Sequence, residues 1–208
     1  ADVVVEAIGG VSPANRIARH ALNRGTRFVT ANKALLAHSG DGLLAFARSR
    51  GVDVDFEAAV GGGVPVIRAL RHSLRNAPVR SIRGILNGTS NYILTRIERG
   101  DSFAEALAAA QATGFAEADS SRDLNGLDSA DKLRVLAWVA YGVAPETIEV
   151  ECEGILPDPE QLVRIAQLRD ERVRLIATCT RDESGRVRAC VRPEFVASDS
   201  RFGRTTDE

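Results

Sequence analysis

The alternation of short apolar runs with stretches of helical spacing in the first sixty residues most restricts how this chain can fold. Apolar runs at residues 3–8, 27–30 and 52–60 predict strands, and the segments between them, 13–24 and 32–50, place apolar residues on one helical face. A glycine follows each helical segment, where helices commonly end. Strands separated by helices at this spacing predict βαβ units, and therefore a parallel sheet in an α/β protein.

The pattern changes after the glycines at 61–63. Pro65 suits the first turn of a helix, and NGTSN at 87–91 predicts a turn whose Ser or Thr caps the next helix. RDESG joins two later apolar runs, as in a hairpin. We therefore predict an α+β second part with a strand at 79–86, helices at 103–112, 127–141 and 159–169, and hairpin strands at 173–180 and 186–191.

Composition excludes several classes of protein. Hydrophobic residues make up 44% of the chain, enough for a core, and the formal net charge of −1 favours neither nucleic acid nor an anionic membrane. No stretch approaches the roughly 20 apolar residues of a membrane span, and the start, ADVVVEAIGG, lacks the basic region of a signal peptide. Three scattered cysteines are too few for a disulfide framework or a zinc site. We expect these cysteines to be small buried residues, and the protein to be cytoplasmic.

Residues 114–132, GFAEADSSRDLNGLDSADK, combine five carboxylates with two basic residues just before an apolar helix. Asp128 and Lys132 are four residues apart, so a helix would place them on one face. Such a group could hold a small amino acid and move a proton. It could equally be a solvated loop with an ordinary ion pair, worth about 0.2–0.5 kcal/mol.

Three further features fall at the carboxyl ends of the predicted parallel strands, where such sheets bind ligands. Gly9 and Gly10 would let a cofactor ring approach the backbone, although a plain tight turn explains them equally well. Lys33 follows a strand, and alone it is an ordinary surface lysine. The glycine run at 61–63 exposes carbonyls which, with Glu57, could coordinate a monovalent cation, or it could simply be a flexible joint.

Taken together, these pieces resemble homoserine dehydrogenase. The resemblance covers nearly all of residues 1 to about 170, and its segments occur in the family's order. It implies an NADPH- or NADH-dependent reduction of aspartate semialdehyde to homoserine, on the route to threonine, methionine and isoleucine, by a cytoplasmic homodimer. The segments that carry it are VVVEAIGG, VTANKALLAHSG, FEAAVGGGVPVIRAL, IRGILNGTSNYIL and GFAEADSSRDLNGLDSADKL.

The resemblance also implies residue roles. Lys132 would be the catalytic proton donor to the aldehyde oxygen, a role that suits an ammonium group aimed at developing negative charge. The substrate would be held by Glu117, Asp128, Asp123, Lys33 and Thr89. The cofactor would lie near Ile8, Gly9, Gly10, Lys33 and Gly114. A Na⁺ or K⁺ ion would be bound by Glu57 and the backbones of Val60, Gly62 and Val64.

Two parts of the family pattern are missing from the sequence. No G-x-G-x-x-G turn precedes the first strand, and the closing FVASDSRFGRTTDE does not resemble the family's last segment. We therefore expect an incomplete chain: a partial Rossmann-like nucleotide-binding domain at 1–60, an α+β substrate-binding and dimerisation domain at 61–195, and a tail at 196–208. Two alternatives stay open, a non-catalytic remnant that binds an amino acid or a partner, and a dehydrogenase for a related semialdehyde.

Overall fold

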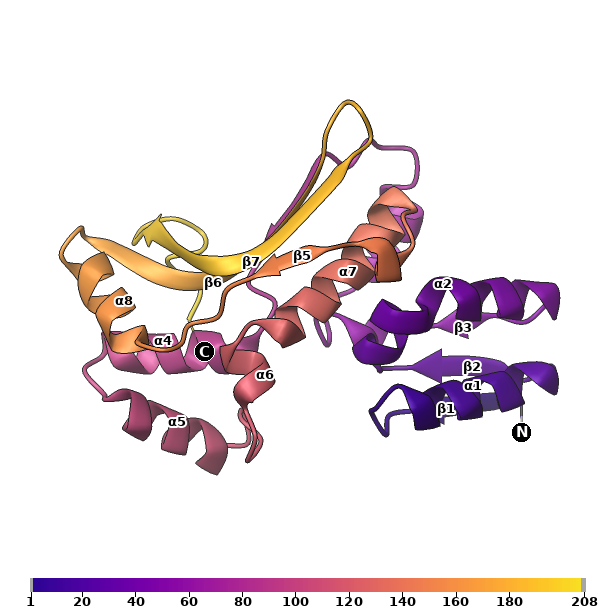
Figure 1. The fold of residues 1–208 in the computed structure, drawn as a ribbon, viewed down its shortest axis with the longest axis horizontal. Coiled ribbons are helices and arrows are strands. Elements are labelled where there is room, and N and C mark those ends of the chain that lie inside the picture. The colour runs from indigo at the N-terminus through magenta and orange to yellow at the C-terminus, as the bar shows by residue number, and fades with distance from the viewer. Residues whose placement is uncertain (1, 207–208) are drawn as a thin grey trace. The chain divides into compact units, whose positions relative to one another are not determined.

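The computed structural model describes residues 2–206, which form two compact units (Figure 1). Unit 1 consists of residues up to Ile82 together with Asp131–Glu149 and Thr180–Arg188. Unit 2 consists of Arg83–Ala130, Val150–Cys179 and the residues from Ala189 onward. The predicted boundaries at residues 60 and 195 stay a prediction.

Unit 1 contains a parallel sheet with the order β1-β2-β3. In the register, Val3 lies opposite Arg27 and Phe28 opposite Val54. The predicted α/β class with a parallel sheet at the start of the chain is therefore confirmed. The elements are β1 (Val3–Glu6), α1 (Ser12–Asn23), β2 (Arg27–Thr30), α2 (Lys33–Ser49) and β3 (Val54–Asp55).

The two helices beside this sheet bury the apolar faces that the sequence predicts. α1 buries Ala14, Ala18, Ala21 and Leu22, which share one face at helical spacing. On α2, Gly40 lies against the indole of Trp138, so a side chain there would overlap the ring. Trp138 also stacks on Phe56, with ring centroids 5.6 Å apart. These contacts form part of the core of unit 1.

The third strand is shorter than predicted. Residues 52–60 were expected to form one strand, but only Val54–Asp55 pair with β2, and Phe56 then turns away (φ −151°, ψ 33°). The 3₁₀ turn η1 (Glu57–Ala59) follows, and after the glycines come α3 (Val66–Arg68) and a π-helical turn, η2 (Ala69–Ser73). The chain turns here because the side chain of Glu57 accepts hydrogen bonds from backbone N–H groups at the start of α3.

Unit 2 is built around α4 (Gly88–Glu98), most of whose residues are buried. In Figure 1, α4 and α8 (Pro159–Gln167) lie along one face of a sheet, and α5 (Phe103–Ala112) lies on the far side of α4. The sheet has the order β4-β6-β7-β5. Its strands are β4 (Ser81–Gly84), β5 (Val150–Cys152), β6 (Glu171–Arg181) and β7 (Val187–Ala197), with residues 180–188 around the β6–β7 hairpin belonging to unit 1.

The remaining elements connect these parts. α6 (Ser121–Leu124) interrupts the acidic run as one short turn, and α7 (Leu127–Tyr141) has the predicted bounds. A second 3₁₀ turn, η3 (Pro145–Thr147), follows α7. Only Cys179 is a buried cysteine, whereas Cys152 is exposed and Cys190 half-buried, so the expectation that all three are buried was wrong.

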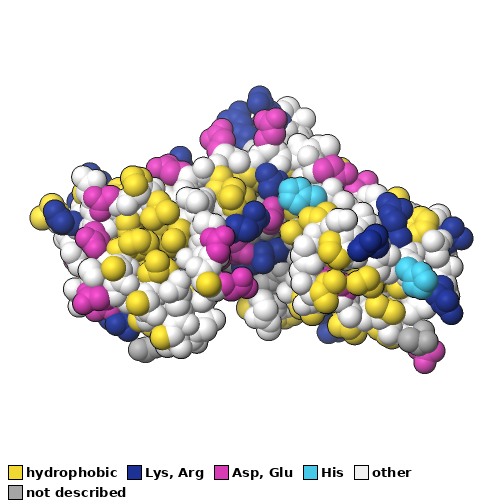
Figure 2. All heavy atoms as spheres, turned by 60° about the horizontal axis from the view of Figure 1, so that its bottom comes forward, with side chains coloured by type: hydrophobic (Ala, Val, Ile, Leu, Met, Phe, Trp, Pro, Cys, Tyr) yellow, Lys and Arg dark blue, Asp and Glu magenta, His cyan; other side chains and the backbone are white. Residues whose placement is uncertain are grey.

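Acidic and basic side chains are interspersed with hydrophobic ones on the face drawn in Figure 2, in keeping with the formal net charge of −1. Within residues 2–206, no helix combines the length and the apolar character that a membrane span needs.

Candidate active site

The loop after β1 is held by a buried carboxylate, Glu6, which was not among the predicted site residues. One oxygen of Glu6, Oε1, accepts hydrogen bonds from the backbone N–H groups of Ile8 (2.9 Å) and Gly9 (3.2 Å). The other, Oε2, accepts one from the Thr30 hydroxyl on the neighbouring strand (2.6 Å). Gly9 and Gly10 have positive φ values of 76° and 72°. This backbone conformation is strained for residues that carry a side chain. Glu6 thus fixes an exposed glycine loop at the carboxyl end of the sheet.

Asn32 joins this loop to α2. Its Oδ1 accepts a hydrogen bond from the Leu35 backbone N–H (2.9 Å), which caps the helix, and its Nδ2 donates to the Gly10 carbonyl (2.7 Å). Lys33, the first residue of α2, is half-buried next to this cap. The structure therefore brings the predicted residues Ile8, Gly9 and Gly10 to the start of the helix that carries Lys33.

The glycine run at 61–63 forms a turn beside Glu57. The two carboxylate oxygens of Glu57 accept hydrogen bonds from the backbone N–H groups of Ile67 (2.9 Å) and Arg68 (2.8 Å). The Gly61 carbonyl accepts one from Val64 N–H (2.8 Å), which closes the turn. Among the described residues, no group of three or more His, Cys, Asp or Glu side chains is arranged to hold a metal ion. The predicted cation site is of another kind, made chiefly of backbone carbonyls.

In unit 2, two predicted acids meet at the N-terminus of α4. The side-chain amide of Asn87 donates to Asp123 Oδ1 (2.6 Å) and to Asp128 Oδ2 (2.9 Å). Asp128 is buried and Asp123 half-buried. Asn87 was not predicted as a site residue. It also caps α4 by accepting from Ser90 N–H, so the prediction that a Ser or Thr of NGTSN caps this helix was wrong.

Two more predicted residues lie near these acids. The Thr89 hydroxyl donates to the Phe115 carbonyl (2.6 Å), immediately after Gly114, and the Phe115 ring stacks on Tyr92. Gly114 has a φ of 79° at the end of α5. Glu117 lies farther along the same loop and is exposed. Thr89 thus fixes the loop that leads from Gly114 toward Glu117.

Lys132 is half-buried and lies one helical turn after Asp128 on α7. Its neighbour Asp131 is buried in unit 1, where it pairs with Arg134 Nη1 (3.1 Å) and lies 3.8 Å from His38 Nε2 on α2. Through these contacts the part of α7 that carries Lys132 packs against α2, whose first residue is Lys33. The two lysines therefore lie on neighbouring helices of one unit.

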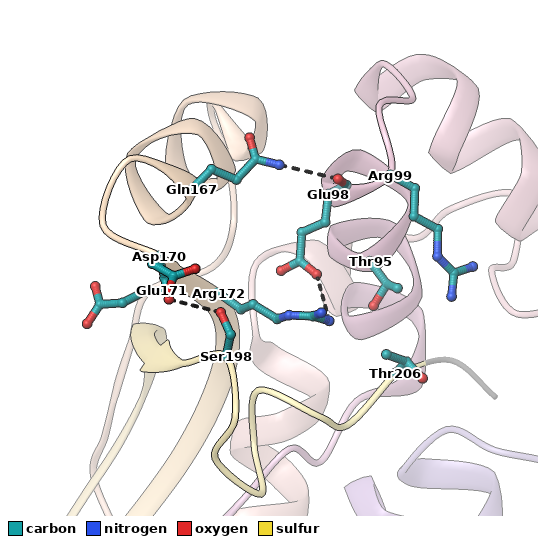
Figure 3. A pocket seen from close by; sticks show the side chains of 9 residues that line it. All are labelled: Thr95, Glu98, Arg99, Gln167, Asp170, Glu171, Arg172, Ser198 and Thr206. Atoms are coloured by element: carbon teal, nitrogen blue, oxygen red, sulfur yellow. Dashed lines mark hydrogen bonds and ion pairs between the residues drawn. The ribbon is translucent and has the colours of Figure 1, made fainter.

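A separate pocket of about 380 Å³ lies in unit 2 among α4, α8 and residues 198–206 (Figure 3). None of the predicted site residues lines it. Its acid Glu98 lies 3.6 Å from Arg172 and is paired with the fully buried Arg174 (2.6 Å). Arg174 also donates to the carbonyls of Gly203 and Thr205. These charges fix the end of the described chain against α4, and they do not point to a ligand.

Both parts of the chain match known families. Residues 1–57 match the family described as "Homoserine dehydrogenase, NAD binding domain", and residues 65–208 match the family described as "Homoserine dehydrogenase". The second match continues past residue 170, to about which the resemblance was expected to extend.

Individual relatives agree. The homoserine dehydrogenase of Pseudomonas aeruginosa is 42% identical over 199 residues, which are 95% of this chain and 46% of that protein. A crystal structure of a homoserine dehydrogenase from Thiobacillus denitrificans has a TM-score of 0.90 and 38% identity over 99% of this chain and 48% of that one. A hyperthermophilic archaeal homoserine dehydrogenase in complex with NADPH has a TM-score of 0.80 and 30% identity, over 96% of this chain and 57% of that one.

The chain spans about half the length of the curated relatives it matches. The family matches include both the parallel sheet with its glycine loop and the unit that holds the paired acids. On these matches, the chain belongs to the homoserine dehydrogenase family.

Proposed function

We propose that this chain is part of a homoserine dehydrogenase that reduces L-aspartate 4-semialdehyde to L-homoserine with NADPH or NADH, in the biosynthesis of threonine, methionine and isoleucine. The proposal rests chiefly on the small number of lysines and on where they occur. Lys33 and Lys132 are the two lysines among 27 basic residues, the others being arginine. Arginine is effectively never deprotonated, whereas an ammonium group is a compact charge that can give up a proton. Both lysines occur at positions to which the family resemblance assigns a role in binding or catalysis.

Lys132 is the proposed proton donor. When hydride reaches an aldehyde carbon, negative charge develops on the oxygen, and an ammonium group aimed at it stabilises that charge and supplies the proton. Its place in the middle of a regular helix, with Asp131 packed against α2, suits a donor that must keep its position.

Asp123 and Asp128 are proposed to receive the ammonium group of the substrate, together with Glu117. Two carboxylates held by one neutral amide keep negative charge with which to attract a cation. Thr89 is proposed to shape the substrate side of the loop after Gly114, and Lys33 to contact both ligands. A nicotinamide cofactor would supply the hydride, and the backbone of Ile8, Gly9 and Gly10, with Lys33 and Gly114, would lie against it.

A Na⁺ or K⁺ ion is proposed at Glu57 and the backbones of Val60, Gly62 and Val64. The donors fit a hard monovalent cation, because they are one carboxylate and backbone carbonyls. Each backbone carbonyl oxygen has two lone pairs, so it can bind a cation while it also accepts one hydrogen bond. Specific binding predicts that NaCl or KCl raises the melting temperature above that in choline chloride at equal ionic strength, and equal temperatures would refute it.

A homodimer and a cytoplasmic location are proposed from the family resemblance. The proposed dimer contact is through the sheet of the second domain. Light scattering of the purified protein should give twice the mass of one chain, and a monomer mass at assay concentration would refute the dimer.

The test of the reaction is NAD(P)H consumption by the full protein. L-aspartate 4-semialdehyde should support turnover, whereas succinate semialdehyde, which has the aldehyde and the acid but no ammonium group, should support little. Comparable rates with the two aldehydes would favour a dehydrogenase for a related semialdehyde. No oxidation of NADPH or NADH with either aldehyde would refute the proposed reaction.

A further inference from the structure

Asn87 occupies a position in which every hydrogen-bonding group of its side chain is used. It is the N-cap of α4 and is 4% exposed. Its Oδ1 accepts from both the backbone N–H (2.7 Å) and the hydroxyl (2.9 Å) of Ser90. Because the oxygen faces these two donors, the amide nitrogen must face the other way.

The nitrogen faces two carboxylates that come from different elements. Asp123 lies on α6, 36 residues after Asn87, and Asp128 lies on α7, 41 residues after it. Each N–H of the amide has one carboxylate oxygen as its acceptor, at 2.6 and 2.9 Å. One side chain therefore bridges both acids and helps to set the distance between them.

The neutrality of this bridge matters as much as its geometry. Two neighbouring carboxylates repel each other, and without compensation one of them tends to take up a proton. An arginine between them would hold both but would cancel the charge that attracts a cation. An amide donates to both acids and adds no charge, so it holds them without cancelling their attraction for an ammonium group.

We infer that Asn87 is a positioning residue that builds the ammonium receptor of the substrate site from Asp123 and Asp128. This inference rests on the proposed function and adds to it a residue that touches the acids rather than the substrate. It predicts that a substitution at Asn87 lowers activity toward substrates that carry an ammonium group and not toward substrates that have only the aldehyde or hydroxyl end.

The test uses Asn87→Asp in the full protein. Asp has the same shape as Asn and caps helices equally well, so α4 keeps its cap. The substitution removes the donor and puts a third carboxylate beside the first two. Asn87→Ser, which also caps but is shorter and neutral, removes the bridge without adding charge, and it serves if Asn87→Asp does not fold.

Asp158→Asn is the matched control, because Asp158 caps α8 in the same unit by accepting from Gln161 N–H (2.9 Å). It is the reverse isosteric exchange at a helix N-cap away from the two acids, and we expect wild-type kinetics. Melting temperatures of all variants report whether the fold is kept.

The readout is kcat/KM for oxidation of two alcohols with NADP⁺ or NAD⁺, L-homoserine and 4-hydroxybutanoate, which lacks the ammonium group. Loss of a hydrogen bond to a charged group lowers kcat/KM for homoserine by about 10- to 100-fold in Asn87→Asp. For 4-hydroxybutanoate the variant should match the wild type.

Equal losses with both alcohols would show general damage, and no loss with either would show that the bridge is not needed; both results overturn the inference alone. A wild-type protein that does not oxidise homoserine overturns the proposed function and this inference with it.

Discussion

Gly40 on α2 offers a sharp test of how unit 1 packs around the helix that carries Lys132. A Cβ atom added at Gly40 would lie 2.9 Å from Cζ3 and 3.0 Å from Cη2 of Trp138. The indole has little room to move away, because it is 7% exposed and stacks on Phe56. Gly42 lies in the same helix, and a Cβ atom there would meet nothing within 4 Å apart from its chain neighbours and the backbone of its own helix.

Alanine at these two positions separates the effect of helix propensity on stability from the effect of steric overlap with Trp138. Replacing a helical glycine by alanine raises the free energy of unfolding by about 0.5–1 kcal/mol when nothing else changes. Gly42→Ala should show this gain. Gly40→Ala has the same gain but must displace the ring, and overpacking costs about 1–3 kcal/mol. We therefore expect Gly40→Ala to be less stable than Gly42→Ala by about 1–3 kcal/mol.

Urea denaturation followed by circular dichroism and by tryptophan fluorescence measures both effects. Trp138 is the single tryptophan of the chain, so its emission reports the displaced ring directly. The folded-state emission should change in Gly40→Ala and stay the same in Gly42→Ala. Equal stabilities and equal emission in the two variants would refute the packing of α2 on α7 described here.

Two other predictions concern buried titratable groups. Glu6→Gln should lower the free energy of unfolding by about 1.5–3 kcal/mol, because it removes a charged acceptor shared by the Thr30 hydroxyl and two backbone N–H groups; thermal or urea unfolding measures this, and a loss no larger than that of the exposed Glu183→Gln would contradict it. Burial, helped by Cys190, raises the pKa of Cys179 from 9.0 to about 11. Well below pH 9 the thiol is protonated in the folded and unfolded states alike. As the pH rises through 9 toward about 11, the unfolded chain loses the proton first, so this group lowers stability in that range. A thiol reagent at pH 8 should therefore label the exposed Cys152 long before Cys179, and equal rates in the folded protein would contradict the burial.

Much of the fold could be predicted where local signals agree with tertiary packing. α5 has the predicted bounds because Ser102 and Glu105 form a capping box at its start. α7 also has its predicted bounds, with Gly126 and Gly142 on either side. β3 was predicted too long because alternation in the sequence does not reveal that the Glu57 side chain bonds the backbone of α3.

The site residues stay a prediction from spacing and resemblance, which named the acids, the lysines and the glycine loop. The hydrogen bonds that hold some of these residues could not be predicted from the sequence. Glu6 and Asn87 were missed because their partners lie up to 41 residues away and become neighbours only in the folded chain. One signal was available for Asn87, since asparagine just before a helix is a preferred cap, but a Ser or Thr of NGTSN was predicted in that role instead.

The most direct test of the central claim is the rate of the full protein with Lys132 replaced. Lys132→Arg keeps a positive charge but not a group that readily donates a proton, and Lys132→Ala removes both. With L-aspartate 4-semialdehyde and NADPH, both variants should lose about 10²- to 10⁴-fold in kcat, the usual contribution of a positioned acid, while NADPH binding is kept. Wild-type turnover by Lys132→Arg would contradict the role of Lys132 as the proton donor.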